Sequence, residues 1–558
     1  MPSTDSGSID RETNRRARQA ALENVVPGDA EPTSLVSYVS HGRLLVIGEE
    51  TAGRDAIARL QGHLDPWLWI PGPGDPVRRD RDRQRRVEGG SPAVTGNLGQ
   101  FTVTVGEGGI AAGPDRLLGE RGGRFDLVLD LRSAPSLSAP ILPVGYYAPR
   151  SDPAALDAAL DELPEMTGEF EKPKFFNYDA SICAHGRSGI PGCTRCIDAC
   201  PTQAIVSAGE EVTVNPYLCQ GGGSCVAACP TGAMTYAFPK VTDLMAHVRR
   251  LLDAYSEAGG KGPVLIFVDE NSAERVQARL DAGLPPEVIP VQVEEIGSLG
   301  LDAWLSCLAY GAAGVVLASS AETPAPVTEA LDAQLEVAGA LLAGMGYPAN
   351  AVQRWSADGA ADAGEGPEVH EGPLLNKAAR FTVPDEKRTA LRLAINHLHA
   401  QAPAPRKIID LPSHAPFGEV RVDGKACTLC MSCVGQCPTA ALSDGAGLPQ
   451  LNFTEWNCVQ CGICARACPE DAIELRARFV FDSDARQTRR VLHEEQPFFC
   501  VSCGKPFATQ SVLDVMKRKL ETHWMFQTEE ARRRLEMCDT CRVKDMARAE
   551  FSKGRDSH

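Results

Sequence analysis

The sequence predicts a multidomain protein of mixed α/β and α+β class. Its 558 residues are too many for a single core, because one domain usually takes about 150 residues, so three to five units are expected. Short apolar runs alternate with helical periodicity in two regions, which is typical of parallel α/β domains. Nineteen of the twenty cysteines lie outside those regions in repeated short groups. Such groups indicate small modules built around metal.

Composition and charge narrow the classes of function. Hydrophobic residues make up 43% and charged residues 23% of the chain, the values of an ordinary globular protein. The formal charge of −17 argues against broad nucleic-acid binding, since a phosphate backbone needs an excess of Lys and Arg. No run reaches the roughly 18 apolar residues of a spanning helix, and no signal peptide is recognised, so we expect a cytoplasmic protein with no membrane span. In that reducing compartment the cysteines are expected to bind metal.

The first third of the chain is predicted to hold a tail and one α/β domain. Residues 1–35 are rich in Ser, Asp, Arg and Pro without an apolar period, which predicts a disordered tail. In residues 36–172, Leu44–Ile47 and Leu127–Leu131 have the pattern of buried strands, and Arg54–Leu64 has helical spacing. This region lacks a GxGxxG sequence after its first strand, so the prediction is a degenerate α/β domain without a nucleotide site.

The clearest motifs lie between residues 406 and 480. They read Cys427-x2-Cys430-x2-Cys433-x3-Cys437-Pro438 and Cys458-x2-Cys461-x2-Cys464-x3-Cys468-Pro469. This is the spacing of bacterial two-cluster ferredoxins, in which each [4Fe–4S] cluster takes three thiolates from one motif and the fourth from the other. The predicted ligand sets are Cys427, Cys430, Cys433 and Cys468 for one cluster, and Cys458, Cys461, Cys464 and Cys437 for the other. Zinc is a much weaker interpretation of eight cysteines at this spacing.

Residues 173–240 carry a divergent copy of the same repeat. Its first half, Cys193-x2-Cys196-x3-Cys200-Pro201, has Ile190 where the leading cysteine belongs, but Cys183 lies a short loop upstream. Its second half, Cys219-x5-Cys225-x3-Cys229-Pro230, has Gly222 in place of the middle ligand. Crossing the fourth ligands as before gives two predicted sets. These are Cys183, Cys193, Cys196 and Cys229 for a [4Fe–4S] cluster, and Cys200, Cys219 and Cys225 for the other site.

The site at Gly222 has three predicted thiolates, and its sequence leaves more than one interpretation of the cluster that it holds. Loss of one ligand leaves the corner that a [3Fe–4S] cluster omits, so this cluster, or a cube with one open iron, is preferred. A site that holds no cluster is the other interpretation. His185 could also bind iron, although a loop histidine is more often solvated.

The region between the two cysteine modules alternates strands and helices. Val264–Val268, Val288–Val293 and Gly314–Leu317 are predicted strands separated by helical segments, so residues 241–357 should form a parallel α/β domain. Cys307 stands alone among apolar residues and is interpreted as a buried small hydrophobic side chain. Residues 358–405 are predicted to be a Gly- and Ala-rich linker followed by a helix.

The C-terminal region, residues 481–558, carries two further CxxC pairs. Cys500, Cys503, Cys538 and Cys541 lack the Cys-Pro turn of the cluster motifs, and a helix-rich segment separates the pairs. Four thiolates in this pattern suit a structural, tetrahedral zinc, with a rubredoxin-like iron as the alternative. The prediction is a zinc-ribbon-like segment.

The chain as a whole resembles the bacterial 4Fe–4S dicluster-domain proteins associated with molybdenum or tungsten formate dehydrogenase systems. The resemblance rests on Glu169–Phe176, Cys183–Gly189 and Val293–Ser298. Such proteins usually have a cysteine at the position of Gly222. Residues 264–356 are also similar to the delta subunit of methyl-viologen-reducing hydrogenase, without the cysteines that bind its [2Fe–2S] cluster. The resemblance therefore implies the fold and the docking role of that subunit but no cluster there.

Two functions from different classes fit these observations. The first is a non-catalytic subunit that relays single electrons between a redox enzyme and another acceptor. The resemblance implies that this enzyme is of formate dehydrogenase type. The second is a maturation or redox-sensing factor whose clusters are structural or are donated to a metalloenzyme. No catalytic triad, paired carboxylates or flavin motif indicates an enzyme with its own substrate. The expected cofactors are three [4Fe–4S] clusters, one [3Fe–4S] or incomplete cluster, and a structural zinc.

Overall fold

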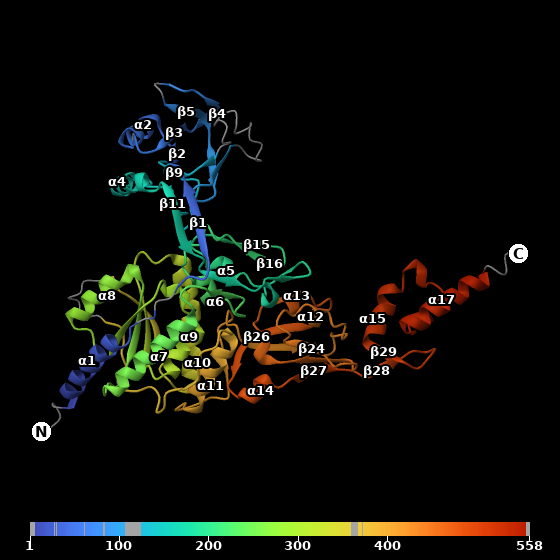
Figure 1. Ribbon diagram of the computed structural model, residues 1–558. Coiled ribbons are helices and arrows are strands. Elements are labelled where there is room, and N and C mark those ends of the chain that lie inside the picture. The colour runs from blue at the N-terminus through green and yellow to red at the C-terminus, as the bar shows by residue number, and fades with distance from the viewer. Residues whose placement is uncertain are drawn as a thin grey trace.

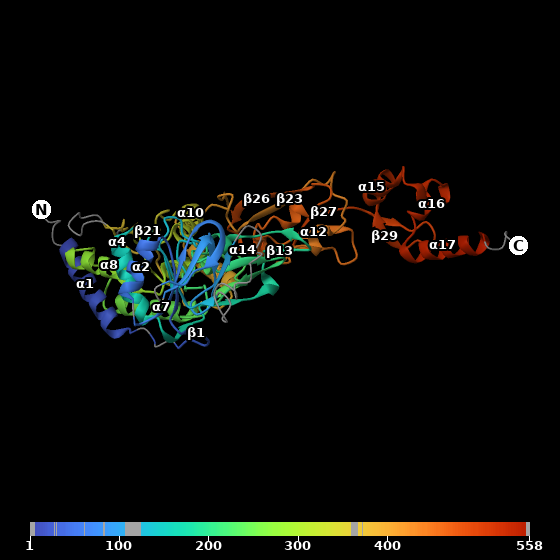
Figure 2. The ribbon, with the colours of Figure 1, turned by 90° about the horizontal axis from the view of Figure 1, so that it is seen from above.

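A computed structural model describes residues 6–26, 28, 31–60, 62–81, 84–105, 124–358, 366–370 and 372–553 of the protein. An N-terminal domain stands on a two-stranded ribbon above a central body, and a C-terminal arm extends from the far end of that body (Figure 1). Seen from above, the body and the arm form one elongated unit (Figure 2). None of the helices in the described ranges is long and apolar enough to cross a bilayer.

The N-terminal domain is built on a six-stranded sheet. In spatial order its strands are β10 (Tyr146–Tyr147), β9 (Leu127–Asp130), β2 (Arg43–Ile47), β3 (Asp65–Ile70), β5 (Arg85–Gly90) and β4 (Gly72–Arg78). All neighbours are parallel except β4 and β5. Helices α2 (Glu50–Arg59) and α4 (Pro153–Glu162) pack on one face, and a small sheet of β6 (Pro92–Thr95), β7 (Phe101–Val105) and β8 (Arg124–Phe125) packs on the other. The two strands predicted from the sequence are thus the neighbouring strands β2 and β9 of this sheet.

A long antiparallel ribbon joins this domain to the body. It consists of β1 (Leu35–Ser40) and β11 (Gly168–Pro173), with Leu35 paired to Pro173 and Ser40 to Gly168. The chain before it differs from the prediction, because residues 6–24 form helix α1 (Ser6–Asn24) rather than a disordered tail. Ala17 and Ala21 are fully buried against the α/β domain, and this contact explains the helix. An alanine face is too weakly apolar to stand out in a polar sequence.

The first cysteine module follows the ribbon. In the described residues it contains three strand pairs and two short α-helices. The strand pairs are β12 (Phe176–Tyr178) with β17 (Met234–Tyr236), β13 (Gly186–Arg187) with β14 (Ile190–Pro191), and β15 (Ile205–Ala208) with β16 (Glu211–Val214). The helices are α5 (Arg195–Asp198) and α6 (Ser224–Ala228). Each helix spans the residues just before the last cysteine of its motif.

A four-stranded parallel sheet forms the core of the body. Its order is β19 (Val288–Gln292), β18 (Val264–Val268), β20 (Gly314–Ser319) and β21 (Val352–Ser356). The helices around it are α7 (Val241–Glu257), α8 (Glu270–Ala282), α9 (Leu301–Ala309) and α10 (Ala325–Met345). The parallel α/β unit predicted here is present, and Cys307 is a fully buried apolar residue of α9. The short turn η3 (Ile296–Ser298) packs against α6 of the first module.

The second cysteine module is attached through α11 (Lys387–Ala400), which packs against α9. The module has two three-stranded sheets and short helices around its motifs. The sheets are β22 (Ile408–Asp410), β26 (Ile473–Val480) and β23 (Gly418–Val422), and β24 (Leu442–Asp444), β25 (Gln450–Phe453) and β27 (Arg490–Glu494). The helical pieces are α12 (Ser432–Gly435), η5 (Glu455–Asn457), α13 (Ile463–Arg466) and α14 (Ser483–Gln487). Because β27 pairs with β25, the module reaches beyond residue 480 to residue 494.

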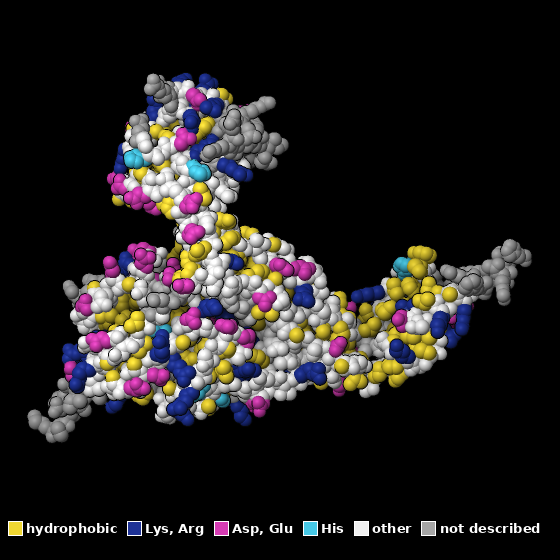
Figure 3. All heavy atoms as spheres, in the orientation of Figure 1, with side chains coloured by type: hydrophobic (Ala, Val, Ile, Leu, Met, Phe, Trp, Pro, Cys, Tyr) yellow, Lys and Arg dark blue, Asp and Glu magenta, His cyan; other side chains and the backbone are white. Residues whose placement is uncertain are grey.

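The C-terminal arm carries the last two CxxC pairs. Its elements are β28 (Pro497–Phe499), β29 (Pro506–Thr509), α15 (Gln510–Leu520), η6 (Trp524–Phe526), α16 (Glu529–Arg534) and α17 (Asp539–Lys553). Hydrophobic side chains gather on its surface more densely than over most of the body (Figure 3). Trp524, for example, is 78% exposed. The arm therefore has too small an apolar core to explain its fold by side-chain burial alone.

Candidate iron–sulfur sites

Four thiols from both motifs of the second module come together beside α13. We call Cys437, Cys458, Cys461 and Cys464 the inner C-terminal set. Burial, with added repulsion from Cys461 and Cys437, raises the pKa of the Cys458 thiol to about 12. Burial and the thiols of Cys458, Cys461 and Cys437 likewise raise the pKa of Cys464. Cys433 of the other set adds a smaller effect on Cys464, so all these thiols lie close together, and the larger effects are those among the four thiols of one predicted set.

The other four thiols of this module converge at its arm-facing end. We call Cys427, Cys430, Cys433 and Cys468 the outer C-terminal set, and all four line one small cavity. Burial and repulsion by Cys427, Cys430 and Cys468 raise the pKa of the Cys433 thiol to about 12. Cys430 is exposed, unlike every member of the inner set. An electron carrier at the outer set would therefore be the one open to a partner.

Backbone amides point at the sulfurs. The amide of Ala441 donates to Cys437 Sγ at 3.3 Å, and the amide of Ala472 donates to Cys468 Sγ at 3.3 Å. Amide donors stabilise thiolates and lower the charge density of a cluster that they hold. A thiol with a raised pKa must still lose its proton when it binds metal. Four thiols around one point make the replacement of their protons by metal favourable. The residues present therefore fit [4Fe–4S] clusters in both sets.

The first module has the same crossed arrangement. Burial raises the pKa of the Cys193 thiol, and Cys229 and Cys183 raise it further. Burial and the thiols of Cys229, Cys193 and Cys183 raise the pKa of Cys196 to about 12. The amide of Met234 donates to Cys229 Sγ at 3.5 Å. The structure thus brings together four thiols that we call the complete N-terminal set: Cys183, Cys193, Cys196 and Cys229.

The three remaining thiols of this module gather at Gly222. We call them the Gly222 set: Cys200, Cys219 and Cys225. Burial raises the pKa of the Cys225 thiol well above its usual range, and Cys219 and Cys200 are the next causes. Lys172 lies beside the set, with its Nζ donating to Cys219 O at 2.5 Å and to Tyr217 O at 3.1 Å. A cation at this distance favours the ionised form of the neighbouring thiols.

The loop at Gly222 keeps the backbone shape of a ligand loop. In the second module the middle ligand Cys461 lies between Gln460 (φ 56°) and Gly462 (φ 81°). Gly222 lies in the same way between Gly221 (φ 86°) and Gly223 (φ 68°). Gly223, like Gly462, is the N-cap of the following short helix. The position of the missing ligand is therefore preserved although its side chain is gone.

His185 is held by the protein through both ring nitrogens. Nδ1 is 2.9 Å from Cys193 O and Nε2 is 2.7 Å from Ser207 Oγ. The imidazole therefore supports the loop of the complete N-terminal set, and neither nitrogen is directed to iron.

The loops of the two modules touch. A Cβ placed on Gly192 would be 2.8 Å from Cδ1 of Ile463, so these residues are in contact. Gly192 directly precedes Cys193, and Ile463 directly precedes Cys464. Arg466 spans the contact, because its Nη2 donates to Pro191 O at 2.5 Å and to Cys461 O at 3.0 Å. The loops of the complete N-terminal set and the inner C-terminal set are thus in direct contact through Gly192, Ile463 and Arg466.

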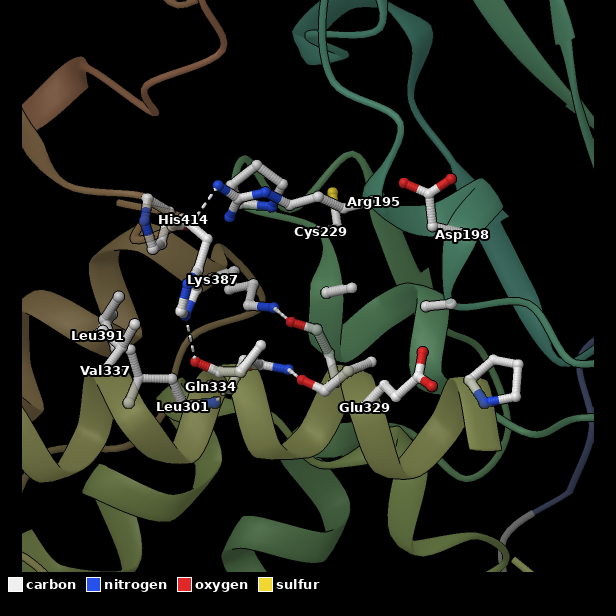
Figure 4. Close-up of a pocket in the computed structure, with 18 of the residues that line it drawn as sticks. Arg195, Asp198, Cys229, Leu301, Glu329, Gln334, Val337, Lys387, Leu391 and His414 are labelled. Atoms are coloured by element: carbon white, nitrogen blue, oxygen red, sulfur yellow. Dashed lines mark hydrogen bonds between the residues drawn. The ribbon is translucent and has the colours of Figure 1, made fainter. Parts of the chain in front are cut away.

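A cavity of about 270 Å³ lies where the first module, α10 and α11 meet (Figure 4). Cys229 and Arg195 approach it from the first module, and Gln334 and Glu329 approach it from α10. Its remaining wall is mostly alanine, leucine, valine and proline. A small molecule in this cavity would lie beside the complete N-terminal set.

The four cysteines of the arm form a compact group. The sulfurs of Cys500, Cys503, Cys538 and Cys541 all lie within 4.8 Å of one another. The Cys503 and Cys538 sulfurs are 3.7 Å apart, close to the edge of about 3.8 Å of a tetrahedron with metal–sulfur bonds of about 2.3 Å. Burial opposes ionisation of Cys500, but backbone amides of Cys538, Ser502 and Cys503 lower the pKa of its thiol to about 6. The group therefore fits a tetrahedral metal.

Sequence reasoning missed three cations that hold the cluster loops. Lys387 Nζ donates to Val226 O at 2.8 Å and to Ala227 O at 2.9 Å in the first module. Arg388, the next residue, donates to carbonyls of the second module. Arg466, the third, bridges both. The pair Lys387-Arg388 at the start of a helix is an unfavourable place for cations, since the helix dipole is positive there. That feature is the signal that could have drawn attention to them.

Comparison with known proteins agrees with the two cysteine modules. Residues 191–233 and 426–473 each match a family described as a 4Fe-4S dicluster domain. The chain therefore carries two such domains, and the prediction of dicluster modules is confirmed. Ferredoxin-type domains of this kind indicate electron transfer.

The chain is also similar over short stretches to individual proteins. An "Iron-sulfur protein" of Rhodospirillum rubrum is 35% identical over 88 residues, 15% of this chain and 45% of that protein. The "Ferredoxin-type protein NapF" of Escherichia coli K12 is 39% identical over 57 residues, 10% of this chain and 35% of that protein. "Pyruvate synthase subunit PorD" of Thermotoga maritima is 38% identical over 58 residues, 10% of this chain and 58% of that protein. The matches cover less than two thirds of each relative.

Proposed function

We propose that the chain relays single electrons between a redox enzyme and a second acceptor through four clusters in series. The order is the Gly222 set, the complete N-terminal set, the inner C-terminal set and the outer C-terminal set. The observation that carries the proposal is the contact between Gly192 and Ile463, because it joins the two dicluster domains at loops that hold predicted ligands. Two unconnected domains would not need this contact.

The cofactors in this proposal are three [4Fe–4S] clusters, a [3Fe–4S] cluster at Gly222 and a structural zinc in the arm. Three thiolates at the Gly222 set, with the backbone of the fourth preserved, support a cluster that lacks one iron. The compact tetrahedral group of the arm supports zinc, since no position is left open for chemistry. The ligands of each site are the residues of the corresponding set.

The donor or acceptor that we propose is an oxidoreductase of formate dehydrogenase type, on the resemblance stated from the sequence. The similar proteins include a ferredoxin-type protein and a subunit of pyruvate synthase, which supports a role beside a redox enzyme. The α/β domain is proposed to act as the docking part, like the delta subunit that it resembles.

The test begins with protein loaded with iron and sulfide under anaerobic conditions. Iron, zinc and sulfide are quantified, and an electron paramagnetic resonance (EPR) titration follows each cluster through reduction and reoxidation. A relay should be reduced and reoxidised repeatedly without losing iron, and it should copurify with its redox enzyme. Transfer of whole clusters to an apo-metalloenzyme would contradict the relay and favour the maturation factor.

A further inference from the structure

Two arginines lie at the loop that leads into the inner C-terminal set, Arg388 against Cys458 and Arg486 against Trp456, and neither makes an ion pair with a carboxylate in the described residues. Arg388, at the start of α11, donates to the carbonyl oxygens of Trp456, Pro416 (3.3 Å) and Cys458 (3.5 Å). Its guanidinium lies 5.0 Å from the ring of Phe417 and 4.7 Å from that of Trp456. In the part of the chain that the structure describes, none of its contacts at ion-pair distance is an acid. Aromatic faces and carbonyls are dipoles, and they leave the positive charge in place.

The second cation, Arg486 of α14, is 2% exposed. Its Nη2 donates to Asn396 Oδ1 at 2.8 Å, whereas Nε and Nη1 have no hydrogen-bond partner. The Arg486 guanidinium lies 4.9 Å from the ring of Trp456 and 4.5 Å from the ring of Phe479. Trp456 is also one of the two rings that Arg388 contacts. Trp456 thus carries a cation close to its ring from each of two helices, and it lies two residues before Cys458.

The carboxylate nearest to this group is already occupied. Glu455 accepts two hydrogen bonds from Arg478, at 2.9 Å and 2.7 Å, and Arg490 lies 3.3 Å from it. Glu419, the other buried acid here, pairs with Arg478 at 2.5 Å and Arg421 at 2.8 Å. Glu455 and Glu419 are therefore matched by other arginines. Glu386 and Asp482 also raise the pKa of Arg388 and Arg486 respectively, but their carboxylates cap the backbones of α11 and α14 and make no ion pair with either guanidinium in the described residues.

Arg486 is buried and Arg388 is half-buried. A cation withdrawn from water without a counter-charge is unfavourable, because its solvation is lost without compensation. Burial lowers the pKa of both guanidinium groups to about 10, so they remain charged at neutral pH. The anion that could compensate them is a cluster bound by four thiolates. The sulfur of Cys458 also accepts a hydrogen bond from Gln460 Nε2 at 3.3 Å.

We propose that Arg388 and Arg486 are tuning residues that raise the reduction potential of the cluster held by the inner C-terminal set. Reduction adds one electron, and so one negative charge, to the cluster, and a nearby buried cation stabilises the reduced form more than the oxidised form. The inference rests on the proposed relay. Within that relay, the cluster of the inner C-terminal set would be the one on which the electron is retained.

The outer C-terminal set has different surroundings. Glu495 is among the charges that raise the pKa of the Cys427 thiol, after burial and the neighbouring thiols. Glu470 lines the same cavity as that set and pairs with the exposed Lys519 at 3.2 Å. Among the described residues that line this cavity there is no arginine. The two clusters of this module should therefore differ in potential although their motifs are the same.

The experiment is an EPR-monitored redox titration of the fully loaded chain and its variants, which needs no partner enzyme. In Arg388→Gln, and separately in Arg486→Gln, the potential of one [4Fe–4S] cluster should become more negative and that of the others should stay unchanged. At the wild-type midpoint, the ratio of reduced to oxidised inner cluster should fall by at least about tenfold. Arg388→Lys keeps the charge and should restore most of the wild-type potential.

The matched control is Arg392→Gln, one turn along α11, where an exposed guanidinium donates to Gln487. Its titration should equal that of the wild type. If both arginine variants load four clusters with unchanged potentials, the tuning role is wrong while the relay stands. If Arg388→Lys shifts the potential as far as Arg388→Gln, the residue acts through packing and the inference is also wrong. Failure of the wild type to show reducible cubes would instead contradict the proposed function itself.

Discussion

At the scale of single residues, Gly222 illustrates how a substitution can remove a ligand and leave its place intact. A Cβ built on Gly222 would meet only the Pro201 ring, at 3.5 Å from Cγ and 4.0 Å from Cδ, which are ordinary contacts. Pro201 follows Cys200, a member of the same set. At Gly223, by contrast, a Cβ would lie 2.5 Å from both Cα and Cβ of Ser298. Only one of these neighbouring glycines is therefore required by the packing.

This difference leads to a prediction for Gly222→Cys. The new thiol should complete the repeat, convert a [3Fe–4S] site to a [4Fe–4S] cluster, and raise the iron content from about fifteen to about sixteen per chain. The measurements are iron analysis and the EPR signal of an oxidised [3Fe–4S] cluster, which should be present in the wild type and absent in the variant.

Gly223→Cys is the matched control for that prediction. Its side chain would clash with Ser298 in a left-handed backbone region, so it should disturb the loop and lower the iron content. A wild type that already shows four equivalent cubes, or three clusters unaffected by Gly222→Cys, would contradict the three-thiolate site.

Glu295, on the turn that packs on the Gly222 loop, predicts a pH dependence. Burial, and then repulsion by Asp269, Glu294 and Glu270, raise the pKa of its carboxyl to about 7. Because the folded pKa is raised, the unfolded chain ionises first, and stability should fall as the pH rises from about 4.5 to 7 and then level off. Glu295→Gln should remove this loss and stabilise the domain by about 2 kcal/mol at pH 8.

Thermal unfolding of wild type and Glu295→Gln checks this at two pH values. The variant should melt higher at pH 8, and the difference should shrink towards pH 5. Glu294→Gln removes one of the charges that raise the pKa of Glu295, so it is the comparison variant and should give a smaller gain with the same pH dependence. An equal gain for Glu295→Gln at both pH values would show that ionisation is not the cause.

At the scale of elements, the short pieces around the cysteines depend on metal more than on their own length. Helices α5, α12 and α13 have four residues each, and isolated helices this short are unstable in water. The arm is similar, because its small cluster of buried residues consists of Cys500, Met537 and Cys538. Metal binding is therefore expected to supply much of the folding free energy of these segments.

For the arm we predict that Cys538→Ser removes one ligand of the structural metal and unfolds the arm locally. Limited proteolysis should then cut between residues 500 and 553 sooner than in the wild type, and about one zinc per chain should be lost. The EPR signals of the clusters should remain, since the arm meets the second module mainly through polar contacts such as Thr509 with Thr428 O (3.5 Å) and Lys519 with Glu470 (3.2 Å).

Cys307→Ser is the control that separates ligand loss from thiol loss. Cys307 is buried in α9 and far in sequence from any pair, so its substitution should leave zinc and the arm unchanged. If Cys538→Ser also abolished a reducible iron signal, the arm site would belong to the relay.

At the scale of the whole molecule, the contact between modules decides whether four clusters act as one path. The Gly192–Ile463 contact and the bridge of Arg466 join the complete N-terminal set to the inner C-terminal set. The outer C-terminal set then lies towards the arm, and the Gly222 set lies against the turn Ile296–Ser298 of the α/β domain. Partners should accordingly bind at opposite ends of the body.

We predict that Arg466→Ala weakens magnetic coupling between the reduced clusters of the two modules. Loss of its bond to Pro191 O removes a fixed point between the loops, so the spin–spin broadening of the fully reduced EPR spectrum should decrease. The iron content should stay the same, because the ligands are untouched.

Arg476→Ala is the control for that experiment. Arg476 lies on β26 in an exposed ion pair with Asp410, and such pairs contribute little to stability. Its spectrum should match the wild type. Unchanged coupling in Arg466→Ala would mean that the modules are held together by other contacts, such as those of Lys387 and Arg388.

Much of the fold could be predicted because its signals are local. The strands at Leu44–Ile47 and Val264–Val268 are short runs of apolar residues, and their burial follows from that pattern alone. Helix α1 was missed because only two alanines face the core, and the end of the second module was placed at residue 480 because β27 is a polar edge strand. Elements held by long-range contacts carry little local pattern.

By itself, the sequence determined the two cysteine modules and predicted which thiols belong together, because ligand spacing on a short loop is a local property of the chain. It also determined that Gly222 lacks a ligand. Only the tertiary structure decided that the loops of Cys193 and Cys464 face each other, that both nitrogens of His185 are taken, and that Arg388 donates to Cys458 O while Arg486 lies over the ring of Trp456. These features join residues far apart in the chain, and their energies depend on burial and on distance in space, which no local pattern records.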